Sequence, residues 1–307
     1  MEYVVQTFDL KKRYKRHFAL DGVNMNIEKG DIYGFVGENG SGKTTVIRTI
    51  TGLISATSGS FSLFGIAGNS NKINCVKRKI GAVVETPSIY RNMSAVENLK
   101  MQGAILGIND PDAIIQVLND VGLGELATSK KSAGDFSLGM RQRLGIAMAL
   151  LGNPELLILD EPMNGLDPAG IVEVRELILK LNREKGITFL ISSHILTELS
   201  LVATKYGIIS KGKIIKEISA EQLIHECRPT VTVESDNLDA LQSVALQFKS
   251  SEDISYSTNG ITLHGELDIN AFITSLVANG ITIKNINCTR SNIEDYYLSL
   301  VGGGKNV

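Results

Sequence analysis

Eight consecutive residues near the N-terminus have the types and the spacing of a loop that binds phosphate. Residues 37–44 read Gly-Glu-Asn-Gly-Ser-Gly-Lys-Thr and fit the pattern G-x-x-x-x-G-K-[ST]. Glycines in such a loop let backbone N–H groups close around phosphate oxygens, while Lys43 would reach the β- and γ-phosphates and the Thr44 hydroxyl would bind Mg²⁺. The residues expected to contact a nucleotide here are Gly37, Glu38, Asn39, Gly40, Ser41, Gly42, Lys43, Thr44 and Thr45.

A second segment carries two adjacent carboxylates at the end of an apolar run. Residues 156–162 read Leu-Leu-Ile-Leu-Asp-Glu-Pro, which is typical of a buried parallel strand that presents acids at the carboxyl edge of a sheet. Asp160 is the expected metal ligand, and Glu161 the expected general base or water-orienting residue. The alternative is a pair of salt-bridge partners, although adjacent buried acids are costly unless a metal pairs with them. Together the two segments predict a nucleotide triphosphatase.

The elements around these segments are those that a phosphate site requires. Residues 32–36 read as a strand that enters the loop, and residues 44–50 as a helix that leaves it. Up to about residue 217 the pattern is α/β with a mostly helical block in the middle. Further strands are predicted at 3–9, 23–27, 60–64, 156–160, 187–191, 206–210 and 213–217 (the last two a hairpin around Lys211 and Gly212), and helices at 94–107, 111–121, after Gly139, and at 169–185.

The last ninety residues follow a different pattern. Strand and helix signals alternate in the order β-α-β-β-α-β, which is the ferredoxin-like split arrangement of a small α+β domain. The capping-box pattern Ser291-x-x-Glu294 predicts a short terminal helix. The first five elements are predicted at 230–234, 238–248, 254–257, 261–263 and 269–278, and the last strand is predicted to start at 281–283, with turns at Asn259-Gly260 and Asn279-Gly280.

Length and composition limit the classes of protein that fit. A chain of 307 residues accommodates two domains, and 43% hydrophobic with 21% charged residues suits a globular protein with a sizeable core. The net charge is −2 and the pI about 6.1, so no nucleic-acid partner is expected. We find no apolar run long enough for a transmembrane helix and no signal peptide. Three cysteines without metal spacing are expected to be reduced, and the protein to face the cytosol.

A third segment gives the chain a resemblance to a known family. Residues 136–144 place Ser137 and Gly139 immediately before a helix with apolar spacing, which taken alone predicts an ordinary N-capped helix. Between the two nucleotide motifs, it resembles the signature motif of the ATP-binding cassette (ABC) family. The resemblance covers residues 1 to about 217 and implies that this segment contacts the γ-phosphate held by the other subunit of a dimer. Leu138 and Met140 depart from the family's usual glycine and glutamine.

The resemblance assigns roles to three further residues. Asp167, in the sequence Asn-Gly-Leu-Asp-Pro, looks like the residue that orders the dimer interface; its alternative is a simple helix cap. His194 follows a β-branched strand and looks like the switch histidine that contacts the γ-phosphate and completes the catalytic set with Glu161 and Lys43. Tyr14 lies in a basic run and occupies the position of the aromatic residue that stacks on adenine; the alternative is a solvated turn.

The segment Val-Val-Glu-Thr-Pro at 83–87 departs from the family in an informative way. Most members carry glutamine where Glu85 stands, and that residue contacts Mg²⁺ and the attacking water. Glutamate can also bind a hard cation, but it adds negative charge near the γ-phosphate. This substitution, together with the Ser-Leu-Gly-Met signature, resembles the exporters that protect bacteria from bacitracin and lantibiotic peptides.

These resemblances imply a two-domain ATPase subunit that binds ATP and Mg²⁺. An ABC-type P-loop NTPase domain is expected at 1–217, with a helical subdomain at about 88–150, and an α+β ferredoxin-like accessory domain at 218–307. The implied assembly is a homodimer, or a heterodimer with a second ABC ATPase, on the cytoplasmic side of the membrane with separate permease subunits. The implied cargo is an antimicrobial peptide or similar compound. Alternatives are a soluble ABC ATPase acting on ribosomes or DNA, an importer, and a regulatory ligand for the last domain.

Overall fold

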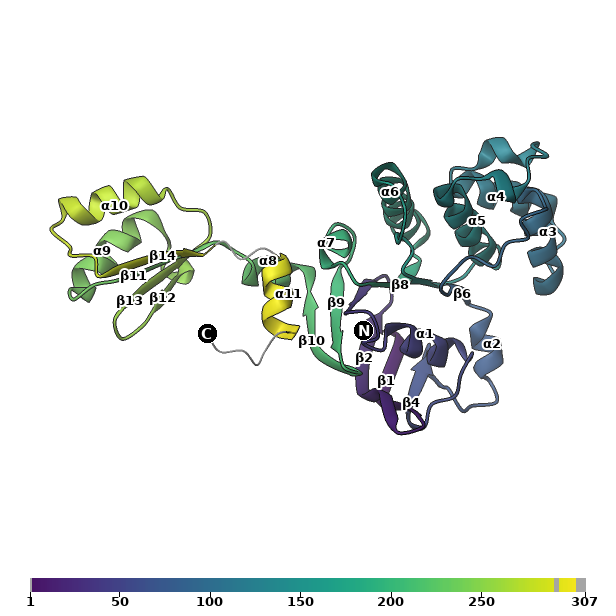
Figure 1. Ribbon diagram of the computed structural model, residues 1–307, viewed down its shortest axis with the longest axis horizontal. Coiled ribbons are helices and arrows are strands. Elements are labelled where there is room, and N and C mark those ends of the chain that lie inside the picture. Colours follow the sequence, from purple (N-terminus) through teal and green to yellow (C-terminus); the bar gives the residue numbers. More distant parts are fainter. Residues whose placement is uncertain (1, 290–292, 302–307) are drawn as a thin grey trace. The chain divides into compact units, whose positions relative to one another are not determined.

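The computed structural model describes residues 2–289 and 293–301 and divides the chain into two compact units, Met1–Ala220 and Glu221–Val307. Each unit has its own sheets, helices and hydrophobic core (Figure 1). No helix among the described residues is both long enough and apolar enough to cross a bilayer. The elements that position the candidate site all belong to the first unit.

A six-stranded sheet forms the centre of the first unit, in the order β10-β9-β3-β8-β7-β6. The five strands from β9 to β6 are parallel, and β10 pairs antiparallel with β9. All five residues of β3 and of β7 are buried, as expected for strands covered on both faces. Its strands are β3 (Ile32–Val36), β6 (Ile80–Val83), β7 (Leu156–Asp160), β8 (Thr188–Ser193), β9 (Lys205–Ser210) and β10 (Lys213–Ser219).

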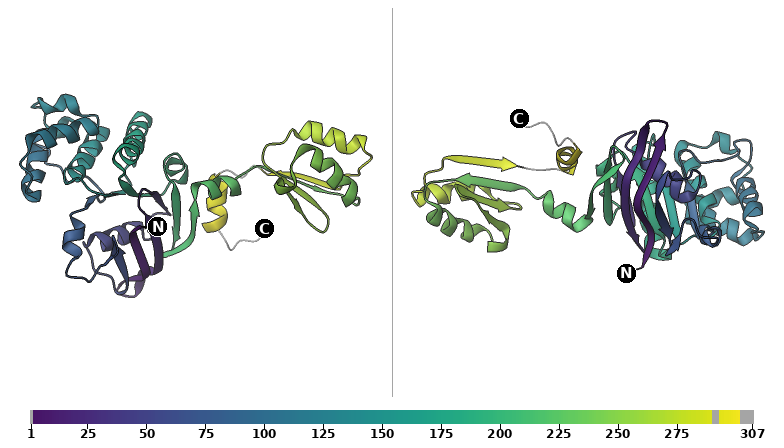
Figure 2. Two further views of the ribbon diagram at one scale, coloured as in Figure 1. Left: turned by 180° about the vertical axis from the view of Figure 1, so that it is seen from behind. Right: turned by 90° about the horizontal axis from the view of Figure 1, so that it is seen from below.

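A second, antiparallel sheet packs its apolar face on the same core, in the order β2-β1-β4-β5 (Figure 2, right). The first two strands form a long hairpin in which Tyr14 pairs with His17. The sequence predicted only residues 3–9 and 23–27 as strand, and this was too short because the basic run continues the ladder instead of forming a solvated turn. The elements are β1 (Tyr3–Tyr14), β2 (His17–Glu28), β4 (Ser58–Leu63) and β5 (Ile66–Ala67), with α1 (Lys43–Thr51) and α2 (Ile73–Lys77) beside them.

The predicted helical block lies at one end of the parallel sheet (Figure 1). Its first helix begins with a capping box, in which Ser94 and Glu97 satisfy each other's backbone N–H groups, and its second begins at Asp110 followed by Pro111. The block is tied to the following long helix by an ion pair between Asp120 and Lys185. The elements are α3 (Ala95–Leu106), α4 (Pro111–Asp120), two short 3₁₀ turns at Gly124–Ala127 and Ala133–Asp135, α5 (Leu138–Leu150), α6 (Pro168–Lys185) and α7 (Leu196–Leu199).

The second unit is an antiparallel sheet with the strand order β12-β13-β11-β14, covered on one face by two helices. This order is that of the split β-α-β arrangement, so the expected ferredoxin-like topology is present. After α8 (Ala220–Glu226) the elements are β11 (Thr230–Glu234), α9 (Leu238–Phe248), a 3₁₀ turn (Ser251–Asp253), β12 (Ile254–Tyr256), β13 (Gly260–His264), α10 (Ile269–Ala278), β14 (Asn285–Thr289) and α11 (Ile293–Val301).

The last predicted strand of this unit is present but begins later than expected. The apolar alternation at 281–283 predicted its start, whereas β14 runs over Asn285–Thr289 and pairs with β11. Ile281 is buried in the core of the unit without joining the ladder, so its apolar character reports burial and not strand pairing. Ser291, the expected cap of the terminal helix, lies outside the described residues.

Candidate nucleotide-binding and catalytic site

The loop between β3 and α1 has the backbone of a phosphate cradle. Gly42 adopts φ 117°, and a Cβ added there would lie 2.8 Å from the carbonyl oxygen of Ala19, so only glycine fits. At Gly37 an added Cβ would lie 2.4 Å from the carbonyl oxygen of Ile209. The first turn of α1 contains no acidic residue and its N-cap Gly42 has no side chain, so the N–H groups at this helix start remain open to an anion.

A pocket of about 210 Å³ lies directly over this helix start. It is lined by six residues between Asn39 and Thr45, including Lys43 and Thr44, and on the other side by Glu161. Two lining residues were not predicted from the sequence, Ala19 and Asn164. Neither belongs to a pattern that carries phosphate chemistry by itself, so only their proximity in the fold identifies them.

Ser41 belongs to the same loop but does not line the pocket. The residue is 5% exposed, and its Oγ is buried without a hydrogen-bond partner among the described residues. Its backbone is fixed, since its N–H donates to the carbonyl of Glu38 (3.1 Å) and its carbonyl accepts from the N–H of Gly212 (2.8 Å). A buried hydroxyl without a partner is costly and therefore uncommon. The hydroxyl lies beside Gly37, where an added Cβ would come within 2.5 Å of it, so glycine is required there as well.

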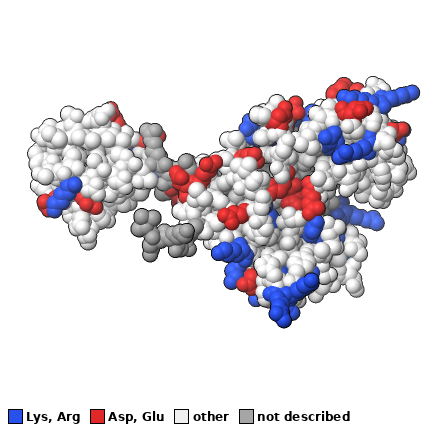
Figure 3. All heavy atoms as spheres, in the orientation of Figure 1, with Lys and Arg blue, Asp and Glu red and all other residues white. Residues whose placement is uncertain are grey.

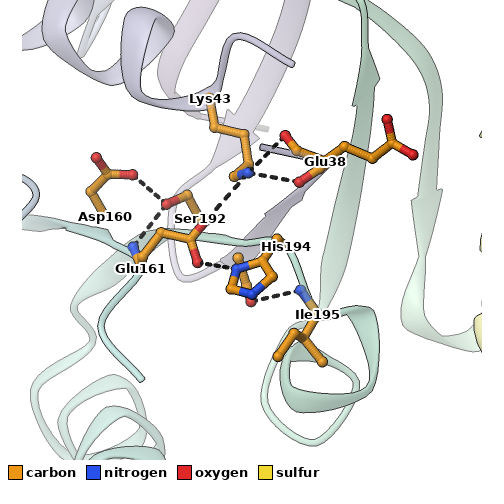
Figure 4. Close-up of polar contacts among 9 residues, drawn as sticks. Glu38, Lys43, Asp160, Glu161, Ser192, His194 and Ile195 are labelled. Atoms are coloured by element: carbon orange, nitrogen blue, oxygen red, sulfur yellow. Dashed lines mark hydrogen bonds and ion pairs between the residues drawn. The ribbon is translucent and has the colours of Figure 1, made fainter. Parts of the chain in front are cut away.

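The three residues expected to carry catalysis meet in one chain of contacts (Figure 4). Lys43 Nζ lies 3.2 Å from Glu161 Oε1, and Glu161 Oε2 lies 2.7 Å from His194 Nδ1. Lys43 also donates to the carbonyl oxygens of Gly37 (2.6 Å) and Glu38 (3.2 Å). The Glu161 carboxylate therefore contacts the lysine that a phosphate is expected to bind.

Ser192 holds the acidic strand end in place, and its role was missed by the sequence analysis. Its Oγ donates to Asp160 Oδ1 (2.5 Å) and accepts from the backbone N–H of Glu161 (2.9 Å). Asp160 is 2% exposed, and Glu161 adopts φ 50°, an unusual value that aligns its side chain with Lys43 and His194. The sign of this role in the sequence is the pair of hydroxyl residues, Ser192 and Ser193, directly before His194. The two acids have protein partners, so their burial does not itself require a metal.

A further carboxylate, Glu198, lies near this chain of contacts. Desolvation by burial raises the pKa of Glu198 above its ordinary value, with His194 opposing and Glu161 reinforcing the shift. Glu198 follows His194 by four residues, and both Glu161 and Glu198 line the same small depression. His194 therefore has two carboxylates near it, those of Glu161 and Glu198.

Glu85 is not brought to the phosphate loop. Its Oε1 lies 2.5 Å from Arg48 Nη2 on α1, and its backbone adopts φ 63°.

Tyr14, the residue expected to stack on adenine, is 46% exposed, lies under the ammonium group of Lys12 and does not line the pocket. It belongs to the hairpin β1–β2, whose Lys and Arg side chains gather at the lower end of the first unit (Figure 3).

The signature and interface residues act as helix caps within this chain. Ser137 Oγ accepts from the N–H of Met140 (3.1 Å) at the start of α5, and Asp167 Oδ1 accepts from the N–H of Gly170 (3.0 Å) at the start of α6. These are the ordinary caps considered as alternatives. The two helix starts are neighbours, because a Cβ added to Gly139 would lie 3.9 Å from the Cα of Gly170. None of these residues lines the pocket of the same chain.

The oxygen ligands that the protein offers beside the pocket suit a cation with few protein ligands. Thr44 lines the pocket and Asp160 lies at the adjoining strand end. Within residues 2–289 and 293–301, no cluster of three or more His, Cys, Asp or Glu side chains could hold a metal ion. Mg²⁺ typically keeps several waters and binds through one or two protein ligands plus substrate phosphates, so this sparse set fits Mg²⁺ bound together with a nucleotide.

Comparisons with known proteins agree with this geometry. The parallel sheet, the cradle before α1 and the acidic end of β7 define a P-loop nucleotide triphosphatase. Residues 20–164 match the family described as ABC transporter. The chain is 43% identical to the bacitracin transport ATP-binding protein BcrA of Bacillus licheniformis over 99% of both chains, and 37% identical to its namesake in Enterococcus faecalis over 99% of this chain and 98% of that one. It therefore belongs to the ATP-binding proteins of ABC transporters and is an ATP hydrolase.

A lantibiotic transport protein and two solved structures also match this chain. The lantibiotic transport ATP-binding protein SrtF of Streptococcus pyogenes is 47% identical, over 68% of this chain and 88% of its own. Among solved structures, cbiO1 of Clostridium perfringens superposes with a TM-score of 0.66 at 28% identity, over 74% of this chain and 92% of that chain. The cassette MJ0796, solved as a dimer bound to ADP and Pi, has a TM-score of 0.63 at 26% identity, over 70% and 98%.

Proposed function

We propose that this chain is the ATPase subunit of an ABC exporter and that two ATPase subunits close around two ATP molecules. The observation that carries the proposal is that the phosphate loop and the Ser137 helix start, which are both expected to contact the nucleotide, do not line the same pocket within one chain. Lys43 and Glu161 line one pocket, whereas Ser137 caps a second helix start, that of α5, and does not line that pocket. A helix start with open N–H groups suits an anion. In a head-to-tail dimer each Ser137 helix would complete the partner's phosphate site, and Asp167 would lie at the same interface.

Each residue of the pocket has a specific part in the proposed hydrolysis. Lys43 and the N–H groups of the loop would hold the β- and γ-phosphates, Thr44 and Asp160 would hold Mg²⁺, and Tyr14 would stack on adenine. Bound there, the metal would supply positive charge that offsets the charge developing on the phosphates. Once a γ-phosphate takes Lys43, the Glu161 carboxylate is released to orient or deprotonate the attacking water, and His194 contacts the γ-phosphate.

The site for the membrane subunit is proposed to be the groove beside β6. This groove has a volume of about 420 Å³ and lies between the α1–β6 side of the sheet and the helical block. Its lining includes Val84 and Thr86, the neighbours of Glu85, together with Leu106 and Met148 from α3 and α5. Leu106 and the adjacent Ile105 are 45% and 74% exposed, so an apolar patch extends from the groove onto α3.

The domain roles and the cargo follow from the same proposal. Residues 1–217 would bind and hydrolyse ATP, the subdomain at about 88–150 would transmit closure to the permease, and residues 218–307 would form an accessory domain. The chain would act at the cytoplasmic side of the membrane, as a homodimer or with a second ABC ATPase. An antimicrobial peptide is the proposed cargo, because relatives that match nearly the whole chain carry the name of bacitracin transport. That whole-chain likeness also disfavours a role on ribosomes or DNA.

A trapped ATP state tests the assembly. The variant Glu161→Gln keeps the shape of the side chain but removes the base, so the protein is expected to elute as a dimer with ATP and as a monomer without it. A pull-down of this variant with ATP from solubilised membranes should recover a polytopic membrane protein at near-stoichiometric yield. A monomer under ATP would contradict the dimer, and soluble ribosomal or DNA-bound partners would contradict the transport role.

A further inference from the structure

The sheet of the second unit has two edge strands that differ in length and in charge. An edge strand presents backbone N–H and C=O groups that another strand can bind, and proteins usually shorten such edges, cover them or place charges on them. β12 has three residues and directly follows Glu252 and Asp253. β14 has five residues, Asn-Ile-Asn-Cys-Thr, without a charge or a proline, and all but Ile286 are exposed. Among the described residues, β14 pairs with β11 and with no other strand.

The hydrogen bonds of the central strand β11 show which of its residues bond to each neighbour. The N–H of Ser235 donates to the carbonyl oxygen of Asn259 (3.2 Å), and the N–H of Gly265 donates to that of Pro229 (2.7 Å). Both bonds are on the side of β13. Because successive residues of a strand direct their N–H and C=O groups to opposite sides, the odd-numbered residues of β11 bond to β13 and the even-numbered residues to β14.

It follows which backbone groups of β14 are open. The even-numbered residues of β11 pair with Asn285, Asn287 and Thr289, so these three residues direct their backbone groups at β11. The N–H and C=O groups of Ile286 and Cys288 then point away from the sheet. No backbone bond joins these two residues to another element of the described chain. The edge therefore offers two donors and two acceptors to a further strand.

The edge is complementary to a second copy of itself. When two β14 strands run antiparallel with Asn287 at the centre, all five residues pair and Ile286 lies opposite Cys288 of the second copy. These are the residues with open backbone groups, so each such pair can exchange two N–H···O bonds. Asn285 then lies opposite Thr289 on the other face of the sheet. We propose that β14 is an interface at which two copies of this chain join their second-unit sheets, in an isologous two-fold contact.

This contact is weak by itself. A ladder of five residues is much smaller than the roughly 1,600 Å² of a typical stable interface. Residues 221–307 also contain eleven acidic and five basic residues, so two second units repel each other at low salt. The copies therefore separate at the dilution of a sizing column, in keeping with the monomer expected without ATP. Where ATP or the membrane subunit already holds two copies together, the pairing would become intramolecular and so stronger; this last step alone rests on the proposed function.

Disulfide formation in the full-length protein, without nucleotide, tests the pairing and its register. The background carries Cys75→Ser and Cys227→Ser, so that Cys288 is the remaining cysteine. Opposed hydrogen-bonded residues lie about 5.5 Å apart at Cα, which a disulfide can span, whereas the two Cys288 residues would be diagonal neighbours at about 7–8 Å, which it cannot. On mild oxidation at high protein concentration, Ile286→Cys should therefore give at least about fivefold more crosslinked dimer than the background protein.

Matched variants separate this pairing from random collision and from misfolding. Asn285→Cys places a cysteine on the same strand but on the opposite face, and should crosslink no more than the background. Added to Ile286→Cys, the pair Asn285→Lys and Thr289→Lys opposes like charges and should lower the yield about two- to tenfold, whereas Asn285→Lys with Thr289→Glu should retain it. Thermal melts show that each variant is folded. Added salt should raise the yield, because it screens the repulsion between acidic units.

The outcomes distinguish this inference from the proposed function. Absence of crosslinking in Ile286→Cys, equal crosslinking in Asn285→Cys, or equal yields in the two charge variants would each overturn the β14 interface. None of these results bears on the ATP-bound dimer, because no nucleotide is present. Conversely, a Glu161→Gln protein that stays monomeric with ATP would overturn the nucleotide dimer and leave the β14 interface standing.

Discussion

The contact between Glu161 and Lys43 predicts that the catalytic carboxylate competes with the nucleotide. Glu161 Oε1 lies 3.2 Å from Lys43 Nζ, with the two side chains 20% and 5% exposed. A γ-phosphate that binds Lys43 must displace this carboxylate and is repelled by it in addition. Replacement of Glu161 by glutamine keeps the size of the side chain and removes its charge, so AMP-PNP should bind more tightly to the variant.

The magnitude follows from the burial of the pair. Hydrogen bonds to charged groups are worth about 1.5–3 kcal/mol and exposed ion pairs about 0.2–1 kcal/mol. For a mostly buried pair in which glutamine retains one hydrogen bond, we take about 1–2 kcal/mol, which corresponds to about five- to thirtyfold in the dissociation constant. Because ADP lacks the γ-phosphate, Glu161→Gln should strengthen ADP binding less than AMP-PNP binding. The ratio of the AMP-PNP affinity to the ADP affinity should therefore rise in the variant.

Isothermal titration with AMP-PNP and ADP measures both affinities, at protein concentrations where sedimentation shows a monomer. Glu198→Gln is the matched control, because it removes a neighbouring carboxylate that does not pair with Lys43, and it should change either affinity by less than about twofold. If Glu161→Gln strengthened ADP binding as much as AMP-PNP binding, or weakened AMP-PNP binding, competition at Lys43 would be refuted.

Three further predictions concern single side chains. Lys43→Ala should weaken ATP binding by about 10- to 100-fold, since a charged hydrogen-bond donor is lost, and unchanged affinity in a filter-retention assay would contradict the phosphate role. Tyr14→Ala should weaken ATP binding by about five- to a hundredfold while Tyr14→Phe retains it, because stacking needs only the ring; equal loss in both variants would exclude stacking. Burial raises the pKa of Glu198, so stability is lost progressively as the pH rises from the ordinary glutamate pKa to the raised one. Thermal melts should therefore show Glu198→Gln more stable than the native protein above the raised pKa, with the difference disappearing below the ordinary glutamate pKa of about 4.3.

The fold was predictable wherever local pattern and burial coincide. The strand–loop–helix around the phosphate site, the hairpin β9–β10 and the helices α9 and α10 have the expected places, because each combines periodicity with a glycine, a cap or a turn residue. The segment Ile80–Val83 was not recognised as a strand, since four residues after a basic stretch carry little signal. The start of β14, with the sequence Asn-Ile-Asn-Cys-Thr, was placed too early, because its pairing with β11 depends on the sheet and not on its own propensity.

The site was predictable as a set of residue types but not as a set of contacts. Motifs named Lys43, Glu161 and His194 separately, and the fold joins them through hydrogen bonds between residues more than thirty positions apart. The partner of Glu85 could not be inferred from the sequence, because Arg48 reads as one more charged residue on a helix. Ser192 was visible only as part of a motif, and its contact with Asp160 needs β7 and β8 to lie side by side.

Two carboxylates pair with basic side chains of α1. Lys43, at the start of that helix, pairs with Glu161, and Arg48, one turn later, pairs with Glu85. A γ-phosphate is the anion that Lys43 is proposed to bind, so ATP would compete with Glu161 for that lysine, whereas ADP lacks the competing group. Release from Lys43 would free the Glu161 carboxylate for the attacking water. The proposed site would therefore place its catalytic carboxylate only when ATP, and not ADP, is bound.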